Sequence, residues 1–336
     1  ANYYRHRPTI GIKEADVLKI DAQFGWHKSM EGVKHLYDDG KVAIVHGVGY
    51  DQPSFSHFTS MSFWHTAAPN SGNEYGWVGR TAATLDSSGT RQNLIVNISD
   101  SQTLAVKAAK HLPLLFIGPT EFQRGLFAQE RAVVDTLAAQ TTPAGDAHRY
   151  VLEVTRSAAQ ASEVVRAAWD RYAATANPDL RLLHLNKVVA LIEADFPSQL
   201  YYVPLRASLF DTHVNQEAPH DRQLQYCADA IEGFFRELRR IGRADDVVLY
   251  VHSEVGRRVP ENTSLGTDHG TAQVNFVIGN SIKGGQYGKP PSLSELVLES
   301  TTDFRRVYAT LIEDWLGVDA KHVLGRPFES LGFVKA

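Results

Sequence analysis

Carboxylates and imidazoles gather in three short segments of the chain, each next to a predicted strand. Six of these side chains are candidate metal ligands: Asp211, His213, His220, Glu254, Asp268 and His269. Carboxylate oxygens and imidazole nitrogens are the ligands with which proteins bind ions such as Zn²⁺, Mn²⁺, Ca²⁺ and Fe²⁺. Brought together, they would hold one or two divalent ions, and two neighbouring ions can clamp a phosphate-like group.

Each segment taken alone also has an ordinary structural explanation. Asp211 can form an Asx-turn with its own backbone, and His269 can simply hydrogen-bond a carbonyl. Three such segments at strand ends are harder to explain by chance, so the metal site and the structural interpretation both stay open at this point.

A fourth segment, 49–58, leaves a predicted strand and brings Ser56 and His57 to the start of a predicted helix. A hydroxyl there can be a nucleophile, because the helix N-terminus favours an anionic substrate. The more common role of serine at this position is the N-cap, and the sequence alone favours it. The chain lacks a Gly-x-Ser-x-Gly elbow, a phosphate-loop lysine motif and a dinucleotide glycine fingerprint. Their absence argues against an α/β-hydrolase with a serine elbow, a P-loop nucleotide enzyme and a dinucleotide-dependent enzyme.

The elements that must position these residues alternate between short strands and long helices. The predicted strands are 42–48, 93–98, 114–117, 200–205, 247–252 and 274–278. Helical patterns cover 122–139, 149–176, 180–192, the segment after His220 and 303–316. This alternation predicts an α/β fold with a mainly parallel sheet that helices cover on both faces. Ligands of such sheets bind beyond the carboxyl ends of the strands.

The composition is that of an ordinary globular protein. The chain has 336 residues, 43% of them apolar, and a formal net charge of −4. This net charge gives no indication of nucleic-acid binding, which requires a basic surface. Its one cysteine, Cys227, excludes an intramolecular disulfide. No apolar run is long enough to span a membrane, and the polar and aromatic residues 1–9 are unlike a signal peptide. We expect a single domain over 1–336 with a helical insertion or cap at about 121–195.

Eight segments, in order along nearly the whole chain, resemble the bacterial "domain of unknown function 1501" family, a branch of the alkaline phosphatase and sulfatase superfamily. They are 45–49 (VHGVG), 56–58 (SHF) with Trp64, 76–80 (GWVGR), 210–213 (FDTH), 253–257 (SEVGR), 266–270 (GTDHG), 283–285 (KGG) and 302–305 (TDFR). The resemblance implies an alkaline phosphatase-like three-layer α/β/α sandwich with metal ligands in loops at one end of the sheet.

The resemblance also implies roles for the candidate residues. Asp211 and His220 would form one ligand pair, with His213 competing for the same role. Glu254 stands where relatives more often carry Asp-His, and His269 would be the last ligand, with Asp268 beside it. Ser56 would be the nucleophile, assisted by His57 or Arg80.

The chain departs from the family pattern in three places. Phe55 stands where members usually carry an anion-binding arginine, and Val255 stands where Phe is usual. Members also carry a first strand with a ligand aspartate just before the segment that begins this sequence, so we expect that strand to be missing upstream. Members are typically exported by a twin-arginine signal, which implies a periplasmic or secreted location.

The sequence therefore predicts a metal-dependent hydrolase that acts on a phosphate or sulfate ester or a related anionic group. Its partner would be a small anionic or ester substrate. Two alternatives remain: a non-catalytic secreted binding or assembly protein that retains the fold, and a metal-dependent phosphotransferase or mutase.

Overall fold

The protein has a mixed α/β fold, in which all six predicted strands are present. The computed structural model describes residues 2–119, 132–133, 136–137, 139, 145–178, 180, 182–205 and 209–336. The six strands are β3 (Val42–Gly49), β4 (Ile95–Ile98), β5 (Leu114–Phe116), β6 (Leu200–Tyr202), β7 (Leu249–Val251) and β10 (Gln273–Ile278). The remaining strands are short: β1 (Leu18–Lys19), β2 (Gly25–Trp26), β8 (Gly256–Arg257), β9 (His269–Gly270), β11 (Gly285–Tyr287) and β12 (Thr302–Asp303).

Most predicted helices are also present. The longer helices are α2 (Glu31–Asp38), α3 (His57–Thr66), α4 (Trp77–Leu85), α6 (Asp146–Ala173), α7 (Leu185–Glu193), α8 (Glu217–Arg240) and α9 (Phe304–Thr310). Short helices are α1 (Asn2–His6), α10 (Ala320–Leu324) and the 3₁₀ turns Glu14–Asp16, Lys28–Met30, Leu104–Val106 and Ala244–Asp246. α9 continues as a π-helix over Leu311–Trp315. The helix expected at 122–139 lies almost entirely outside the described residues.

β3 is the centre of the largest sheet, whose strand order is β11-β3-β10-β7 with β12 also paired to β3. All eight of its residues are buried. Val42 and Ile44 belong to one hydrophobic cluster, which contains residues of α2 and α8. Ala43 and Val45 belong to another, which contains residues of α9 and α10. Because successive side chains of a strand point to opposite faces, β3 packs against helices on both sides, and its sequence is accordingly apolar almost throughout.

The expectation of a mainly parallel sheet is confirmed only in part, because β10 runs antiparallel to both of its neighbours, β3 and β7. β11 and β12 are parallel to β3, and a separate sheet of order β5-β4-β6 is parallel throughout. Residues 252–272 join β7 to β10 without a helix. A parallel pair usually needs a helical crossover, whereas this connection returns the chain in the opposite direction. The start of β10 therefore lies at the edge where β3 and β7 end.

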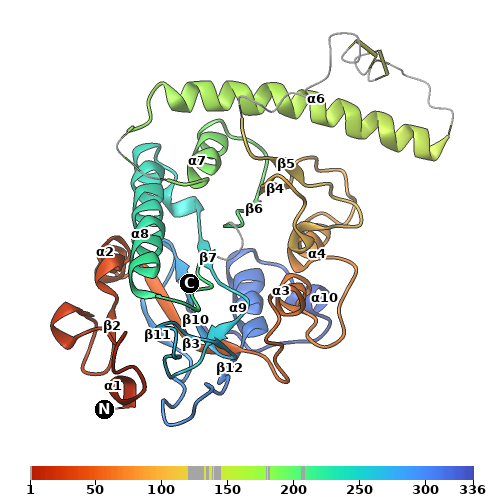
Figure 1. The fold of residues 1–336 in the computed structure, drawn as a ribbon. Coiled ribbons are helices and arrows are strands. Elements are labelled where there is room, and N and C mark those ends of the chain that lie inside the picture. Colours follow the sequence, from red (N-terminus) through yellow and green to blue (C-terminus); the bar gives the residue numbers. More distant parts are fainter. Residues whose placement is uncertain are drawn as a thin grey trace.

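The described part of the expected insertion at 121–195 is helical. α6 contacts α7, and α7 in turn contacts α8. In Figure 1, α6 runs along the top of the molecule above α7, and its far end extends beyond the rest of the fold.

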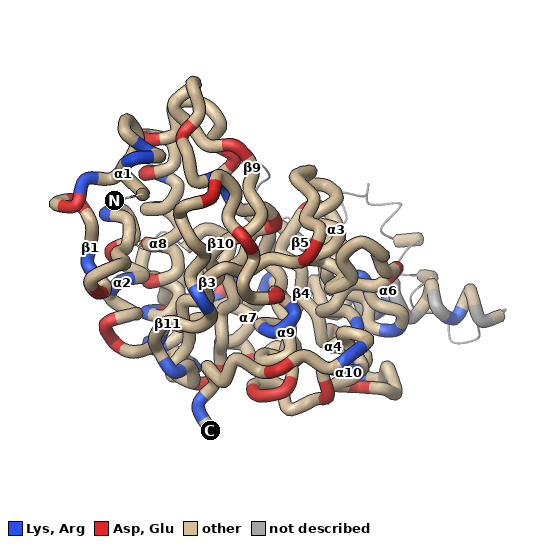
Figure 2. Tube along the Cα trace, turned by 90° about the horizontal axis from the view of Figure 1, so that it is seen from below, with Lys and Arg blue, Asp and Glu red and all other residues tan. Residues whose placement is uncertain are grey.

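Charges of both signs are spread over the described chain, so that Lys and Arg lie among Asp and Glu (Figure 2). Within the described residues, none of the helices combines the length and the apolar character that a membrane span requires.

Candidate metal centre

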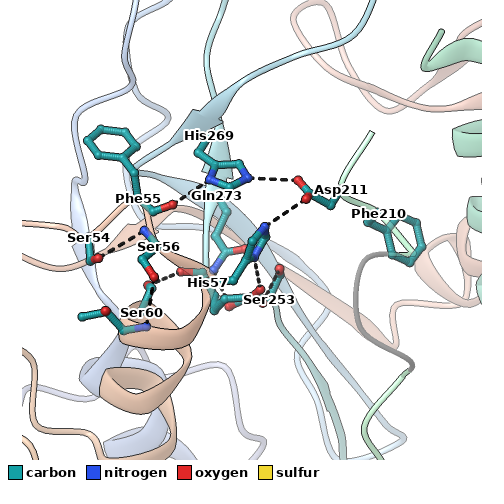
Figure 3. A network of polar contacts seen from close by, with 12 residues as sticks. Ser54, Phe55, Ser56, His57, Ser60, Phe210, Asp211, Ser253, His269 and Gln273 are labelled. Carbon is teal, nitrogen blue, oxygen red and sulfur yellow. Dashed lines mark hydrogen bonds and ion pairs between the residues drawn. The ribbon is translucent and has the colours of Figure 1, made fainter. Parts of the chain in front are cut away.

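Side chains from three parts of the chain meet at the edge where β3 and β7 end and β10 begins (Figure 3). His57 is the first residue of α3, which follows β3. Asp211 lies in the loop between β6 and α8. His269 begins β9, which precedes β10. If β10 were parallel to its neighbours, His269 would lie at the opposite edge of the sheet, because it precedes β10 in the chain. The reversed direction of β10 brings it to this edge.

Both imidazoles approach the Asp211 carboxylate through their Nε2 atoms. His57 Nε2 lies 3.2 Å from Asp211 Oδ2, and His269 Nε2 lies 3.0 Å from Asp211 Oδ1. One ligand atom from each of the three residues lies within 4.8 Å of the others. We call His57, Asp211 and His269 the candidate metal centre.

The opposite ring nitrogen of each imidazole is held by an acceptor. His57 Nδ1 lies 2.6 Å from Glu254 Oε1, and His269 Nδ1 lies 2.6 Å from the backbone carbonyl oxygen of Phe55 (Figure 3). An ionised carboxylate and a carbonyl only accept hydrogen bonds, so each Nδ1 carries the proton and donates. Both Nε2 atoms face Asp211, and that of His269 lies within hydrogen-bonding distance of Asp211 Oδ1 at 3.0 Å.

In a neutral imidazole that is protonated at Nδ1, the Nε2 atom carries a lone pair, which a carboxylate repels unless a cation lies between them. His57 Nε2 is buried and has no hydrogen-bond partner among the described residues, since its contact with Asp211 lacks hydrogen-bond geometry. A divalent ion bound to both nitrogens and the carboxylate would satisfy all three groups. Metal-binding histidines characteristically donate their other N–H to a carboxylate or a backbone carbonyl, as His57 and His269 do. The residues present therefore fit a metal ion.

Glu254 belongs to this arrangement as the partner of His57. Its second oxygen, Oε2, accepts a hydrogen bond from Ser253 Oγ at 3.0 Å. The buried Ser60 of α3 donates to the Glu254 backbone carbonyl at 2.5 Å. The first contact holds the carboxylate and the second holds the Glu254 backbone against α3, so that together they help to orient the His57 ring. The sequence predicted Glu254 as a ligand, and that role stays a prediction, since its contact with the candidate metal centre is the one with His57 Nδ1.

His213 joins the cluster from the same loop as Asp211. Its Nε2 lies 2.9 Å from Asp211 Oδ1 and 3.0 Å from His269 Nε2, and its Nδ1 lies 3.3 Å from Asp268 Oδ1. Asn262 supports this side, because its amide nitrogen donates at 3.0 Å to both Asp268 Oδ1 and the His213 carbonyl. Asp268 is thus a partner of His213, in the way that Glu254 is a partner of His57.

His220 lies apart from these contacts, inside α8. Its ring packs edge-on against Phe210 and His27, each with a centroid separation of 6.0 Å. Burial lowers the pKa of His220 to about 4, so the ring is neutral near pH 7. No described contact joins His220 to Asp211, so of the two histidines that compete to pair with Asp211, the structure brings His213 to it.

Arg257 contributes a positive charge at Asp211 Oδ1, the oxygen that His213 and His269 also approach. Its guanidinium contacts Asp211 Oδ1 and also lies 3.4 Å from His213 Nε2. It donates to the backbone carbonyls of Phe210 at 3.1 Å and Thr267 at 2.8 Å. Burial by itself raises the pKa of Asp211, but the contacts with His269 and Arg257 outweigh this and hold that pKa well below its usual range. Asp211 is therefore an anion.

Ser56 and Arg80 make structural contacts. The Ser56 hydroxyl caps α3, accepting from Thr59 N at 3.5 Å, which confirms the N-cap interpretation. Arg80 donates to the backbone carbonyls of Tyr75, Thr66 and Val323, the last two at 2.7 Å. The described contacts do not join Arg80 to the metal centre, so its assisting role stays a prediction.

Two parts of the site were not predicted from the sequence. Arg257 lies inside the segment 253–257 that carries the family resemblance, and its place directly after Gly256 at a strand end was the available signal. The Phe55 carbonyl could not be predicted, because every residue type carries a backbone carbonyl and the sequence does not show which one accepts a hydrogen bond.

Fold and site together define a mixed α/β protein with a candidate His/Asp/His metal centre. The chain matches the family model described as "Protein of unknown function (DUF1501)" over residues 13–331, and it therefore belongs to that family. No curated protein and no solved structure shows a significant match to the chain.

Proposed function

We propose that this protein is a metal-dependent hydrolase of a phosphate or sulfate ester or a related small anionic group. The observation that carries the proposal is the pair of Nε2 atoms, from His57 and His269, that face the Asp211 carboxylate while their Nδ1 atoms are held by acceptors. Such a set of nitrogen and oxygen donors suits Zn²⁺, Mn²⁺ or Fe²⁺.

His57, Asp211 and His269 would hold the ion. When bound, a divalent ion supplies a Lewis acid that stabilises negative charge on the ester and lowers the pKa of a coordinated hydroxyl or water. Glu254 and the Phe55 carbonyl keep the two rings oriented. Ser56 directly precedes His57 and is exposed at the N-terminus of a ten-residue helix, where an anionic group is favoured. In this proposal Ser56 supplies the nucleophile and exchanges its cap contact for the substrate.

The resemblance supports two further parts of the proposal. It favours membership of the alkaline phosphatase and sulfatase superfamily, with a three-layer sandwich, and helices do pack on both faces of β3. It also favours export to the periplasm or out of the cell.

Metal analysis combined with a panel of phosphate and sulfate esters tests the proposal. The metal-loaded wild type is expected to hydrolyse at least one ester, and His269→Ala is expected to lose both the metal and the activity. His220→Ala is the matched control, because it removes a half-buried imidazole outside the metal centre and should leave metal content unchanged. A wild type that stays metal-free and inert after reconstitution would exclude the proposal.

The nucleophile is tested separately with Ser56→Asn. Asparagine is as good an N-cap as serine but has no hydroxyl, so the variant keeps the helix start and removes the reacting group. We expect metal content to be retained and turnover to be lost. Full turnover in Ser56→Asn would exclude Ser56 as the nucleophile.

A second candidate is a non-catalytic member of the family that binds a partner. The contacts of Ser56 and Arg80 favour it, since the hydroxyl caps a helix and the guanidinium is occupied by backbone carbonyls. On this alternative, metal binding and thermal stabilisation by metal persist, and no ester of the panel is turned over. Turnover that depends on His269 would exclude it.

A further inference from the structure

We propose that Arg257 limits this site to a single metal ion, because its guanidinium occupies the position in which a second ion would bind. This inference rests on the proposed metal-dependent function. The sequence allowed one ion or two, and the candidate metal centre by itself does not decide between them.

A second ion would need its own ligands beside the first. The two atoms best placed to serve are Asp211 Oδ1 and His213 Nε2, which lie 2.9 Å apart. Asp211 would then serve the first ion through Oδ2, which faces His57, and the second through Oδ1, which His269 Nε2 also approaches at 3.0 Å. The His213 ring is already supported behind its Nδ1 by Asp268. This is the arrangement on which a two-ion site is built.

The Arg257 guanidinium contacts these same two atoms. One terminal nitrogen bonds Asp211 Oδ1, and the other lies 3.4 Å from His213 Nε2. A guanidinium remains protonated at any pH at which the protein is folded. The ligands of a second ion are therefore already paired with a cation, and an added divalent ion would be repelled by it.

The position of the guanidinium does not depend on Asp211 alone. The same two nitrogens donate to the carbonyls of Thr267 at 2.8 Å and Phe210 at 3.1 Å. These carbonyls precede Asp268 and Asp211 directly in the chain, so Arg257 also holds together the two loops that supply the site. An ion that binds between His57, His269 and Asp211 leaves both carbonyl contacts intact, and the positive charge stays in place.

Equilibrium dialysis of the full chain against Co²⁺ tests the inference, with bound metal measured per protein molecule. Wild type is expected to bind one equivalent. Arg257→Met, which keeps most of the apolar stem and removes the charge, is expected to bind two. Arg258→Met is the matched control, because it removes the same charge from the exposed neighbouring position and should leave the ratio at one.

Further variants separate the charge from the loop contacts. Arg257→Lys keeps the charge and is expected to bind one equivalent. The double variant Arg257→Met/His213→Ala is expected to return to one, since it lacks a ligand of the second ion. If Arg257→Met does not fold, as judged by circular dichroism, Arg257→Gln replaces it, because its amide can still donate to a carbonyl.

The outcomes distinguish this inference from the proposed function. Wild type that binds two equivalents overturns the role of Arg257 and leaves the metal-dependent function standing. A folded Arg257→Met or Arg257→Gln that stays at one equivalent also overturns it. If wild type binds no Co²⁺, as is expected of His269→Ala, the proposed metal-dependent function itself is excluded.

Discussion

Replacing Glu254 with glutamine is expected to weaken metal binding without removing a metal ligand. The Glu254 carboxylate accepts from His57 Nδ1 at 2.6 Å, a short contact typical of a charge-assisted hydrogen bond. Its side chain is only 14% exposed, so water screens this interaction little. The negative charge raises the basicity of the imidazole and holds its Nε2 toward Asp211. Glutamine retains the shape and removes the charge.

The magnitude follows from the position of Glu254 behind a ligand. Changes to such partners typically cost about 10- to 100-fold in metal affinity. At about 1.4 kcal/mol for each factor of ten, this corresponds to about 1.4 to 2.8 kcal/mol of binding free energy. We expect Glu254→Gln to lie in this range because both of its oxygens are engaged, one by His57 and one by Ser253.

The assay is a competition titration in which a chelator of known affinity and the protein share Zn²⁺. Asp268→Asn is the matched control, since it makes the same chemical change to a carboxylate that also faces an imidazole Nδ1, that of His213. Because His213 is outside the metal centre, this control should change the affinity less. Equal affinity in Glu254→Gln and wild type, or a larger loss in Asp268→Asn, would refute the reasoning.

Three further predictions concern stability, each measured by urea denaturation. Ser56→Ala should lower the free energy of unfolding by about 1 kcal/mol through loss of the N-cap, and an unchanged value would contradict the cap. Arg80→Met should cost about 3 kcal/mol, since it leaves three carbonyls without their donor; a loss well below that would show that water replaces the guanidinium. Burial lowers the pKa of His65 to about 4 from 6.5, so unfolding takes up a proton between these values and stability falls as the pH falls through this window. His65→Gln should therefore reduce the stability lost between pH 7.5 and pH 5 by about 2 kcal/mol, and an identical pH dependence in variant and wild type would contradict this.

The strands were predictable because their signal is local. β3 is buried on both faces and reads as a continuous apolar run, which a single sequence shows directly. The direction of β10 was not predictable in this way, because an apolar segment of that length fits a parallel or an antiparallel neighbour equally well. What decides it is the connection from β7, which contains no helix and turns the chain back.

The residue types of the site could be predicted from the sequence, but the way these residues are arranged in space could be predicted less well. The sequence brought forward Asp211 and His269 as ligands and His57 as a catalytic assistant, and these three form the candidate metal centre. It could not rank His213 against His220, since the two lie on either side of the start of α8 and only the fold turns one toward Asp211. It also could not distinguish a ligand from the partner of a ligand. Glu254 has the chemistry of both, and its contact with His57 Nδ1 favours the second role.

The central claim is that one metal ion binds between His57, Asp211 and His269. A crystal soaked in Mn²⁺, with anomalous diffraction collected above and below the metal absorption edge, tests it most directly. We expect one anomalous peak bonded to both Nε2 atoms and to the Asp211 carboxylate, with Arg257 still bound to the Phe210 and Thr267 carbonyls. A peak with other ligands, or no peak at this site at full Mn²⁺ saturation, would contradict it.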